Sequence, residues 1–410
     1  MRNLSLLLFF IASLGHAQAA PLTFSAALDL AERQSPSLAA QQARVDAAQS
    51  VAISADALPD PKLILGIDNL PITGADRGNP NRDFMTMQKV GVMQEIPNAD
   101  KRHARAEAAQ AGVDMRRAER RIEQVKLRNE TAQAWLRRYY LGQRSAVFDA
   151  FDQENRLLAE AVRARLAAGR GEAGDAVLPK QEAAQLADRR DDLERDLAKA
   201  KAELRRLIGP QGDAPLAGDP PPLVIDANAY RQQVHLHPEL AAFGPASDQA
   251  AAEVREAEAA KKSDWGVEVA YQQRAPQYSD MVSIQFTFDL PIFTGTRQEP
   301  RIAAMQMEET RIAAERDATL RMHIAELDND LADHAALTRQ LERARGTWSS
   351  LAQQRVDLQT AGYQAGKVDL VNLLSARREL IDQRLKIIDL EQQRQMVAGK
   401  LYFSVGEGAQ

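Results

Sequence analysis

The sequence predicts a mainly α-helical protein with a membrane β-barrel, built from a duplicated helix–strand–strand–long helix–helix unit. Three observations carry this prediction. Long stretches place core residues at alternating three- and four-residue intervals, which is the seam of a coiled coil. Two other stretches alternate apolar and polar residues, as amphipathic strands do. Short matches recur at offsets of about 200 residues, which indicates one supersecondary unit used twice.

Composition narrows the possible functions. The chain has 52 basic and 57 acidic residues and a formal net charge of -5, which argues against nucleic acid as a partner. It has no cysteine, so disulfides, thiolate metal sites, cysteine nucleophiles and a lipid-modified N-terminal cysteine are excluded. No nucleotide-binding loop and no hydrolase or metalloprotease motif is present. We therefore expect neither an enzyme nor a cofactor.

Residues 264–292 give the clearest strand signal, a β-hairpin with one apolar and one polar face. Each run has about ten residues, the length that a tilted strand needs to cross a bilayer. Residues 62–96 alternate less regularly, and the duplication supports a matching hairpin there. The apolar positions of the second hairpin are Trp265, Val267, Val269, Tyr271, Val282, Ile284, Phe286, Phe288 and Leu290.

Long helices are predicted at 100–168 and 298–362, each followed by a turn and a shorter helix, at 175–208 and 368–403. About 69 residues at 1.5 Å each make roughly 100 Å of helix, which is longer than globular domains use. The seam of the first long helix is Met115, Ala118, Ile122, Val125, Asn129, Ala132, Leu136, Tyr139 and Gln143. The seam of the second is Leu337, Leu341, Ala344, Trp348, Leu351, Arg355 and Leu358.

The order of these segments divides the chain. Residues 1–19 have the charge, apolar run and small-residue cleavage pattern of a signal peptide, with a buried helix or membrane anchor as the alternative. The first repeat spans 20–208, a Gly/Pro linker 209–225, the second repeat 226–403 and a tail 404–410. The second repeat opens with a helix predicted at 226–262. Residues 36–40 (PSLAA) match 238–242 (PELAA), and Ala168-Gly169 matches Ala365-Gly366.

Four strands cannot close a membrane barrel, because both edges would expose unpaired backbone groups to lipid. Several copies must therefore pool their strands. Two copies give eight strands and three give twelve, and both are possible barrel sizes. The strand count alone does not choose between them.

The whole mature sequence, including its duplication, resembles the TolC family of outer-membrane efflux proteins. The most similar branch serves heavy-metal resistance of the cobalt–zinc–cadmium type, on residues 69–74 (NLPITG), 83–87 (DFMTM) and 91–97 (GVMQEIP) with Lys101-Arg102. The resemblance implies a homotrimer with a shared 12-stranded β-barrel in the outer membrane and a trimeric α-helical tunnel in the periplasm. It also implies a periplasmic adaptor and an inner-membrane RND-type pump as partners. Without a cysteine, no N-terminal lipid anchor is expected.

The function implied is a passive conduit that exports divalent heavy-metal cations. A channel for drug efflux or type I protein secretion is the first alternative, and a periplasmic coiled-coil scaffold without a pore is the second. The alternating hairpins argue against the scaffold. The sequence names neither the ion, nor the open or closed state, nor the adaptor and its contacts.

The tunnel should narrow at the turns marked by Gly169 and Gly366. Family members often carry aspartates where this chain has Asn372 and Ser375. The nearby acids here are Glu172, Asp175 and Asp369. Three copies of each would form rings that favour cations. The alternative is that these acids only cap helix N-termini, and the two roles are compatible.

The histidines offer little for metal binding at the level of sequence. His235 and His237, with Glu239 adjacent, could form half of a site, although a solvated junction is the simpler interpretation. His323 and His334 lie eleven residues apart on one helix, roughly 16 Å along its axis, which is too far to share an ion. No metal site is assigned from the sequence.

Overall fold

A computed structural model describes residues 21–404 of the protein. The predicted signal peptide and all but the first residue of the predicted tail lie outside this range. Helices predominate, which confirms the mainly α class. The chain forms two compact units, which are described separately. No helix of the described chain is both long and apolar enough to cross a membrane.

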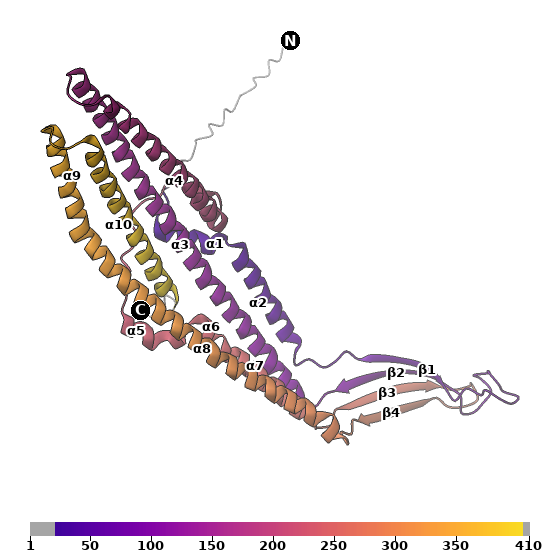
Figure 1. Cartoon of the computed structure of the whole chain (residues 1–410). Helices are drawn as coiled ribbons and strands as arrows, with labels where there is room; N and C mark the ends of the chain where they lie inside the picture. The colour runs from indigo at the N-terminus through magenta and orange to yellow at the C-terminus, as the bar shows by residue number, and fades with distance from the viewer. Residues whose placement is uncertain (1–20, 405–410) are drawn as a thin grey trace, which may run out of the picture. The chain divides into compact units, whose positions relative to one another are not determined.

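The sheet unit consists of Pro36–Val125 and Asp226–Asn329. Its four strands are β1 (Lys62–Asp68), β2 (Met87–Ile96), β3 (Trp265–Gln273) and β4 (Met281–Phe288). They form one antiparallel sheet in the order β1-β2-β3-β4, so the two predicted hairpins lie side by side (Figure 1). Its helical elements are α2 (Pro36–Ser54), the first part of α3 (Ala99–Ala167), α5 (Ala227–Gln233), η3 (Val234–Leu236), α6 (Pro238–Ala241), α7 (Phe243–Ala259), η4 (Thr294–Thr296) and most of α8 (Gln298–Arg343).

The strand register aligns the apolar residues into rows that cross the whole sheet. One row is Leu65, Val90, Tyr271 and Val282, and the next is Leu63, Val92, Val269 and Ile284. All eight side chains are exposed in the single chain, from 47% for Tyr271 to 69% for Val282. The alternation in the sequence therefore corresponds to one continuous apolar face.

Glycine sets the contact between the two hairpins. Gly91 on β2 lies opposite Ala270 on β3. A Cβ on Gly91 would lie 2.8 Å from the Ala270 Cβ, closer than two carbon atoms can pack. A larger residue would force the central strands apart.

A polar junction joins the start of β3 to the start of α3. One carboxylate oxygen of Asp264 accepts hydrogen bonds from the backbone and side-chain nitrogens of Asn98, at 2.8 and 2.9 Å. The other accepts one from Lys101 Nζ at 2.8 Å. Burial acts to raise the pKa of Asp264, but the hydrogen bonds from Lys101 and Asn98 outweigh it and hold that pKa below its ordinary value.

The predicted helix at 226–262 is wrong as a single element, because the structure breaks it into α5, η3, α6 and α7. Pro238 supplies the reason. A proline pushes the residue before it out of the helical region, and His237 is extended, with φ -54° and ψ 131°. Pro238 then occupies the first turn of α6, where its missing N–H costs nothing.

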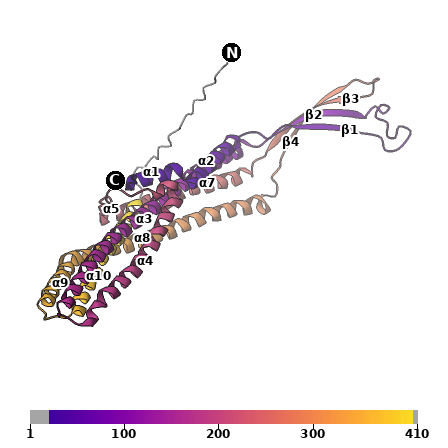
Figure 2. The same ribbon diagram turned by 90° about the horizontal axis from the view of Figure 1, so that it is seen from above.

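The helical unit consists of the described residues up to Ser35, Lys126–Ile225 and Asp330–Phe403. It contains α1 (Phe24–Gln34), the rest of α3, η1 (Ala173–Ala176), α4 (Leu178–Ile208), η2 (Gly209–Asp213), the end of α8, the π-helical segment η5 (Ala344–Trp348), α9 (Ser349–Gln364) and α10 (Leu370–Ser404). Helices α3, α4, α9 and α10 run alongside one another here (Figures 1 and 2). The predicted long helix at 298–362 is therefore α8 and α9 joined through a π-helical turn.

Two buried groups organise this unit around α3. Trp135 is fully buried, packs edge-on against Phe24 at 5.4 Å and donates from Nε1 to the Leu22 carbonyl at 3.2 Å. The Arg138 guanidinium is also buried and donates to the carbonyls of Gly212 and Ala214. The segment predicted as a linker is thus held against α3 at its start.

Candidate functional site: the two helical turns

The turn after α3 is a glycine-terminated Schellman motif. Gly169 has φ +69°, a left-handed conformation that glycine adopts without steric cost. The Arg170 N–H donates to the Arg165 carbonyl at 2.9 Å, and the Gly169 N–H donates to the Leu166 carbonyl at 3.0 Å. These bonds satisfy carbonyls at the helix end that have no partner within the helix.

The turn after α9 repeats the motif. Gly366 has φ +71°, the Lys367 N–H donates to the Gly362 carbonyl at 2.8 Å, and the Gly366 N–H donates to the Tyr363 carbonyl at 3.1 Å. The matching Ala-Gly pairs of the sequence therefore mark equivalent backbone turns.

Two of the predicted site acids act as caps. The Asp369 carboxylate accepts a hydrogen bond from the Asn372 N–H at 2.8 Å and so caps α10. Asp175 completes a capping box at the start of η1: its carboxylate accepts a hydrogen bond from the N–H of Glu172, the N-cap residue, at 3.3 Å. A helix cap of this kind stabilises by about 1 kcal/mol. Capping does not exclude a role in selectivity, because the Asp369 side chain is exposed.

The predicted residues differ in exposure. Glu172, Asp369, Asn372 and Ser375 are exposed, and Asp175 is half-buried. Asn372 and Ser375 are three residues apart on α10, so they share one face of that helix. In the single chain, these side chains are free to interact with solvent or with another molecule.

An apolar cluster joins the two turns into one packed body. Its buried members are Val162 of α3, Tyr363 of α9 and three leucines of α10, and Leu178 of α4 packs against it. Arg165 reinforces the connection: its Nη1 donates to the Tyr363 carbonyl at 2.6 Å, and its guanidinium lies 4.4 Å from the centre of the Tyr363 ring. Arg165 and Tyr363 are not among the site residues predicted from the sequence. A basic residue in the last turn of a helix was the available signal.

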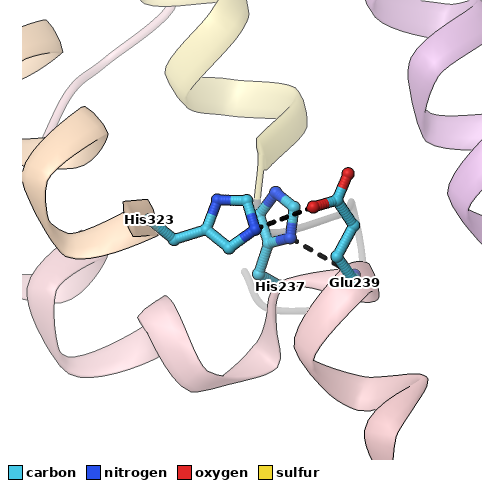
Figure 3. Close-up of side chains that lie close together, drawn as sticks. All are labelled: His237, Glu239 and His323. Carbon is cyan, nitrogen blue, oxygen red and sulfur yellow. Dashed lines mark hydrogen bonds and ion pairs between the residues drawn. The ribbon is translucent and has the colours of Figure 1, made fainter. Parts of the chain in front are cut away.

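A second group of polar side chains gathers in the sheet unit (Figure 3). His323 of α8 is only 7% exposed, and its Nε2 lies 3.0 Å from Oε2 of Glu239, 84 residues away in sequence. Its Nδ1 lies 3.3 Å from Glu326 Oε2. The His237 ring stacks on the His323 ring with centroids 3.7 Å apart, and its Nδ1 accepts from the Glu239 N–H at 3.3 Å.

Burial lowers the pKa of His237 to about 4, with a further contribution from neighbouring His323, so its imidazole is neutral at pH 7. The sequence suggested pairing His237 with Glu239, excluded pairing His323 with His334, and gave no sign that His323 lies beside the first pair. The break in the predicted helix at Pro238 makes that contact possible.

Residues 227–407 match the family model described as outer membrane efflux protein. A search of curated protein sequences found no match to the chain. The family is one of efflux proteins, which agrees with the expectation of transport without catalysis.

Solved structures share the fold over nearly the whole chain. A membrane protein from Pseudomonas aeruginosa superposes with a TM-score of 0.81 at 18% identity, over 94% of this chain and 90% of the other. CusC, whose structures are described in connection with transmembrane channel formation, superposes with a TM-score of 0.79 at 16% identity, over 95% of this chain and 94% of the other. The outer membrane protein VceC from Vibrio cholerae gives 0.78 at 19% identity over 94% and 97%. The chain therefore shares the fold of these membrane proteins over nearly its whole length.

Proposed function

We propose that the chain is the outer-membrane channel of an efflux system and that three copies pool their sheets into a 12-stranded barrel. The sheet carries this proposal. Its apolar face is exposed, and β1 and β4 are each paired on one side only among the described strands. In lipid, open sheet edges leave backbone groups without hydrogen bonds, so further copies must complete the sheet.

Exposed seam residues of the helical unit support association in the same way. Trp348, Leu351 and Leu358 belong to the predicted seam and are 53%, 52% and 73% exposed in the single chain. A neighbouring copy would cover them. Three chains would then form the helical tunnel in the periplasm.

The conduit itself is passive. We propose that a periplasmic adaptor and an inner-membrane RND-type pump supply direction and energy, and that the cargo is a divalent heavy-metal cation. The cargo rests on the sequence resemblance to the metal-resistance branch. Rings formed by three copies of Glu172, Asp175 and Asp369 would attract cations at the turns, with Asn372 and Ser375 beside them.

Growth of a deletion strain tests the cargo. We expect reduced tolerance to zinc, cobalt, cadmium or copper and unchanged tolerance to a panel of drugs. Loss of drug tolerance alone, or of secretion of a protein substrate, would select the first alternative. Gel mobility tests the assembly: an unboiled sample should run as a compact trimer and a boiled sample as a monomer, whereas a pore-free scaffold would show no such shift.

Charge at the turns can be separated from capping. Asparagine caps helices about as well as aspartate does, so Asp175→Asn with Asp369→Asn removes charge and keeps the caps. We expect this pair to lower cation selectivity in planar bilayers. The matched Asp175→Glu with Asp369→Glu pair keeps the charge and should retain selectivity. Equal selectivity in all three channels would remove these residues from the gate.

A further inference from the structure

We propose that His237, Glu239 and His323 form a binding site for a divalent transition-metal ion of the zinc class, within the sheet unit. Each residue offers one ligand atom, and the three atoms lie within 4.8 Å of one another. The site is independent of the proposed transport function, because it would hold an ion in place rather than conduct it.

The donor set defines the class of ion. Two imidazoles and one carboxylate suit zinc, cobalt, nickel or copper, whereas magnesium and calcium prefer oxygen ligands throughout. Three protein ligands leave one tetrahedral position for water. The group also differs from a cluster of exposed carboxylates, because the His323 imidazole is almost fully buried.

Glu326 supplies the supporting interaction that metal-binding histidines usually have. Its carboxylate lies 3.3 Å from Nδ1 of His323, the ring nitrogen opposite the one that approaches Glu239. A carboxylate in this position fixes the histidine tautomer that leaves Nε2 free to bind a metal, and it makes that nitrogen more basic.

Small side-chain movements convert the arrangement into a coordination site. Ligand atoms around tetrahedral zinc lie about 3.3–3.5 Å apart. The His323 and Glu239 atoms are already 3.0 Å apart. The two imidazole planes are 30° from parallel, and an ion must lie in both planes, so the His237 ring has to rotate out of the stack. If Nδ1 of His237 is the ligand, the ion replaces the 3.3 Å hydrogen bond from the Glu239 N–H.

An open groove of about 410 Å³ reaches the site at Glu239, which is one of its lining residues. The charged side chains that line it are Glu119, Glu239, Glu253, Glu308, Arg311 and Glu315. Five carboxylates against one guanidinium give the groove a negative potential, which raises the local concentration of cations.

An occupied site would have a defined structural effect. It would join the start of α6 to α8 directly beside the break that Pro238 introduces. Binding to the folded state alone raises the free energy of unfolding, so the ion should stabilise the sheet unit.

Zinc titration of the mature full-length protein tests the proposal. The protein in detergent is stripped of metal with a chelator and titrated with Zn²⁺, with Mg²⁺ as the comparison ion. We expect one zinc ion per chain, no competition from magnesium, and an increased melting temperature. His237→Ala and His323→Ala should abolish the binding, and Glu326→Gln should weaken it by about tenfold.

Two histidines serve as matched controls. His235 is exposed and lies two residues from His237, so His235→Ala should retain the zinc ion. His103 and Glu107 form an exposed pair four residues apart on α3, so His103→Ala tests whether any surface pair suffices. Zinc binding that survives in His323→Ala, or that is lost equally in His235→Ala, would overturn the assignment.

Cobalt gives a measurement that needs no variant. Co²⁺ bound to the wild-type protein through three side chains and water should show strong visible absorption bands, and Zn²⁺ should remove them. The rival arrangement is His323 held between Glu239 and Glu326 by hydrogen bonds at both ring nitrogens, which has no place for an ion. Wild-type protein without cobalt bands and without zinc binding would support that arrangement and refute the metal site.

Discussion

Replacing Arg165 by glutamine tests whether the two helical turns behave as one body. The change removes the 2.6 Å hydrogen bond to the Tyr363 carbonyl and the guanidinium over the Tyr363 ring. A hydrogen bond from a charged group contributes about 1.5–3 kcal/mol, and a partly exposed cation–π contact about 0.5–1 kcal/mol. Arg165 is only half-buried, and the Tyr363 carbonyl keeps its bond from Gly366. We therefore expect a loss of roughly 1.5–2.5 kcal/mol, a factor of about 10 to 70 in local opening.

Hydrogen exchange measures this opening directly. The amides of Gly366 and Lys367 are bonded within the second turn, so they should exchange faster in Arg165→Gln by that factor. Arg170→Gln is the control, because Arg170 is an exposed arginine of the first turn. Exchange at the wild-type rate in Arg165→Gln, or equal acceleration in Arg170→Gln, would refute the reasoning.

Three further outcomes are expected. Gly362→Ala places a Cβ 2.6 Å from Val368 Cγ2, so it should lower the free energy of unfolding by about 1–3 kcal/mol in denaturant titrations. Gly346→Ala is the control and should not lower it, because no atom lies within 4 Å of the added Cβ. Trp135→Ala should cost about 3–5 kcal/mol in the same assay because the side chain is fully buried; a loss below about 1 kcal/mol would contradict this. The lowered pKa of Asp264 means that its stabilising contribution is present above the carboxylate's unfolded-state pKa and is lost as the pH falls through the folded-state pKa. Protection of the β3–α3 junction from hydrogen exchange should therefore fall in acid, and Asp264→Asn should remove that dependence.

Local physics explains why much of the fold could be predicted. The apolar residues of a helix recur every three or four positions and those of a strand every second position, so α3 and the two hairpins could be predicted from short windows of the sequence. Glycine is favoured where the backbone becomes left-handed, so Gly169 and Gly366 could be predicted to mark equivalent turns. The capping role of Asp175 and Asp369 follows from the same short-range logic.

The candidate sites depended more on long-range contacts. The contact between Arg165 and Tyr363 joins residues 198 positions apart, and that between Glu239 and His323 joins residues 84 positions apart. No periodicity records such pairs, because side chains meet through packing that the linear sequence does not encode locally. The break at Pro238 differs from these contacts, because its signal is local: a proline disfavours a helical conformation in the residue before it.

The sequence by itself determined the helical and strand character of this protein, its two glycine turns and the side of each strand that is apolar. Only the tertiary structure decided that the hairpins join through β2 and β3 and that the apolar rows stay exposed. It also brought His237, beside the helix break, into contact with His323 of α8. The physical reason is range. Propensity, periodicity and capping act over a few residues, whereas strand order, exposure and ligand clusters are set by which distant surfaces pack together.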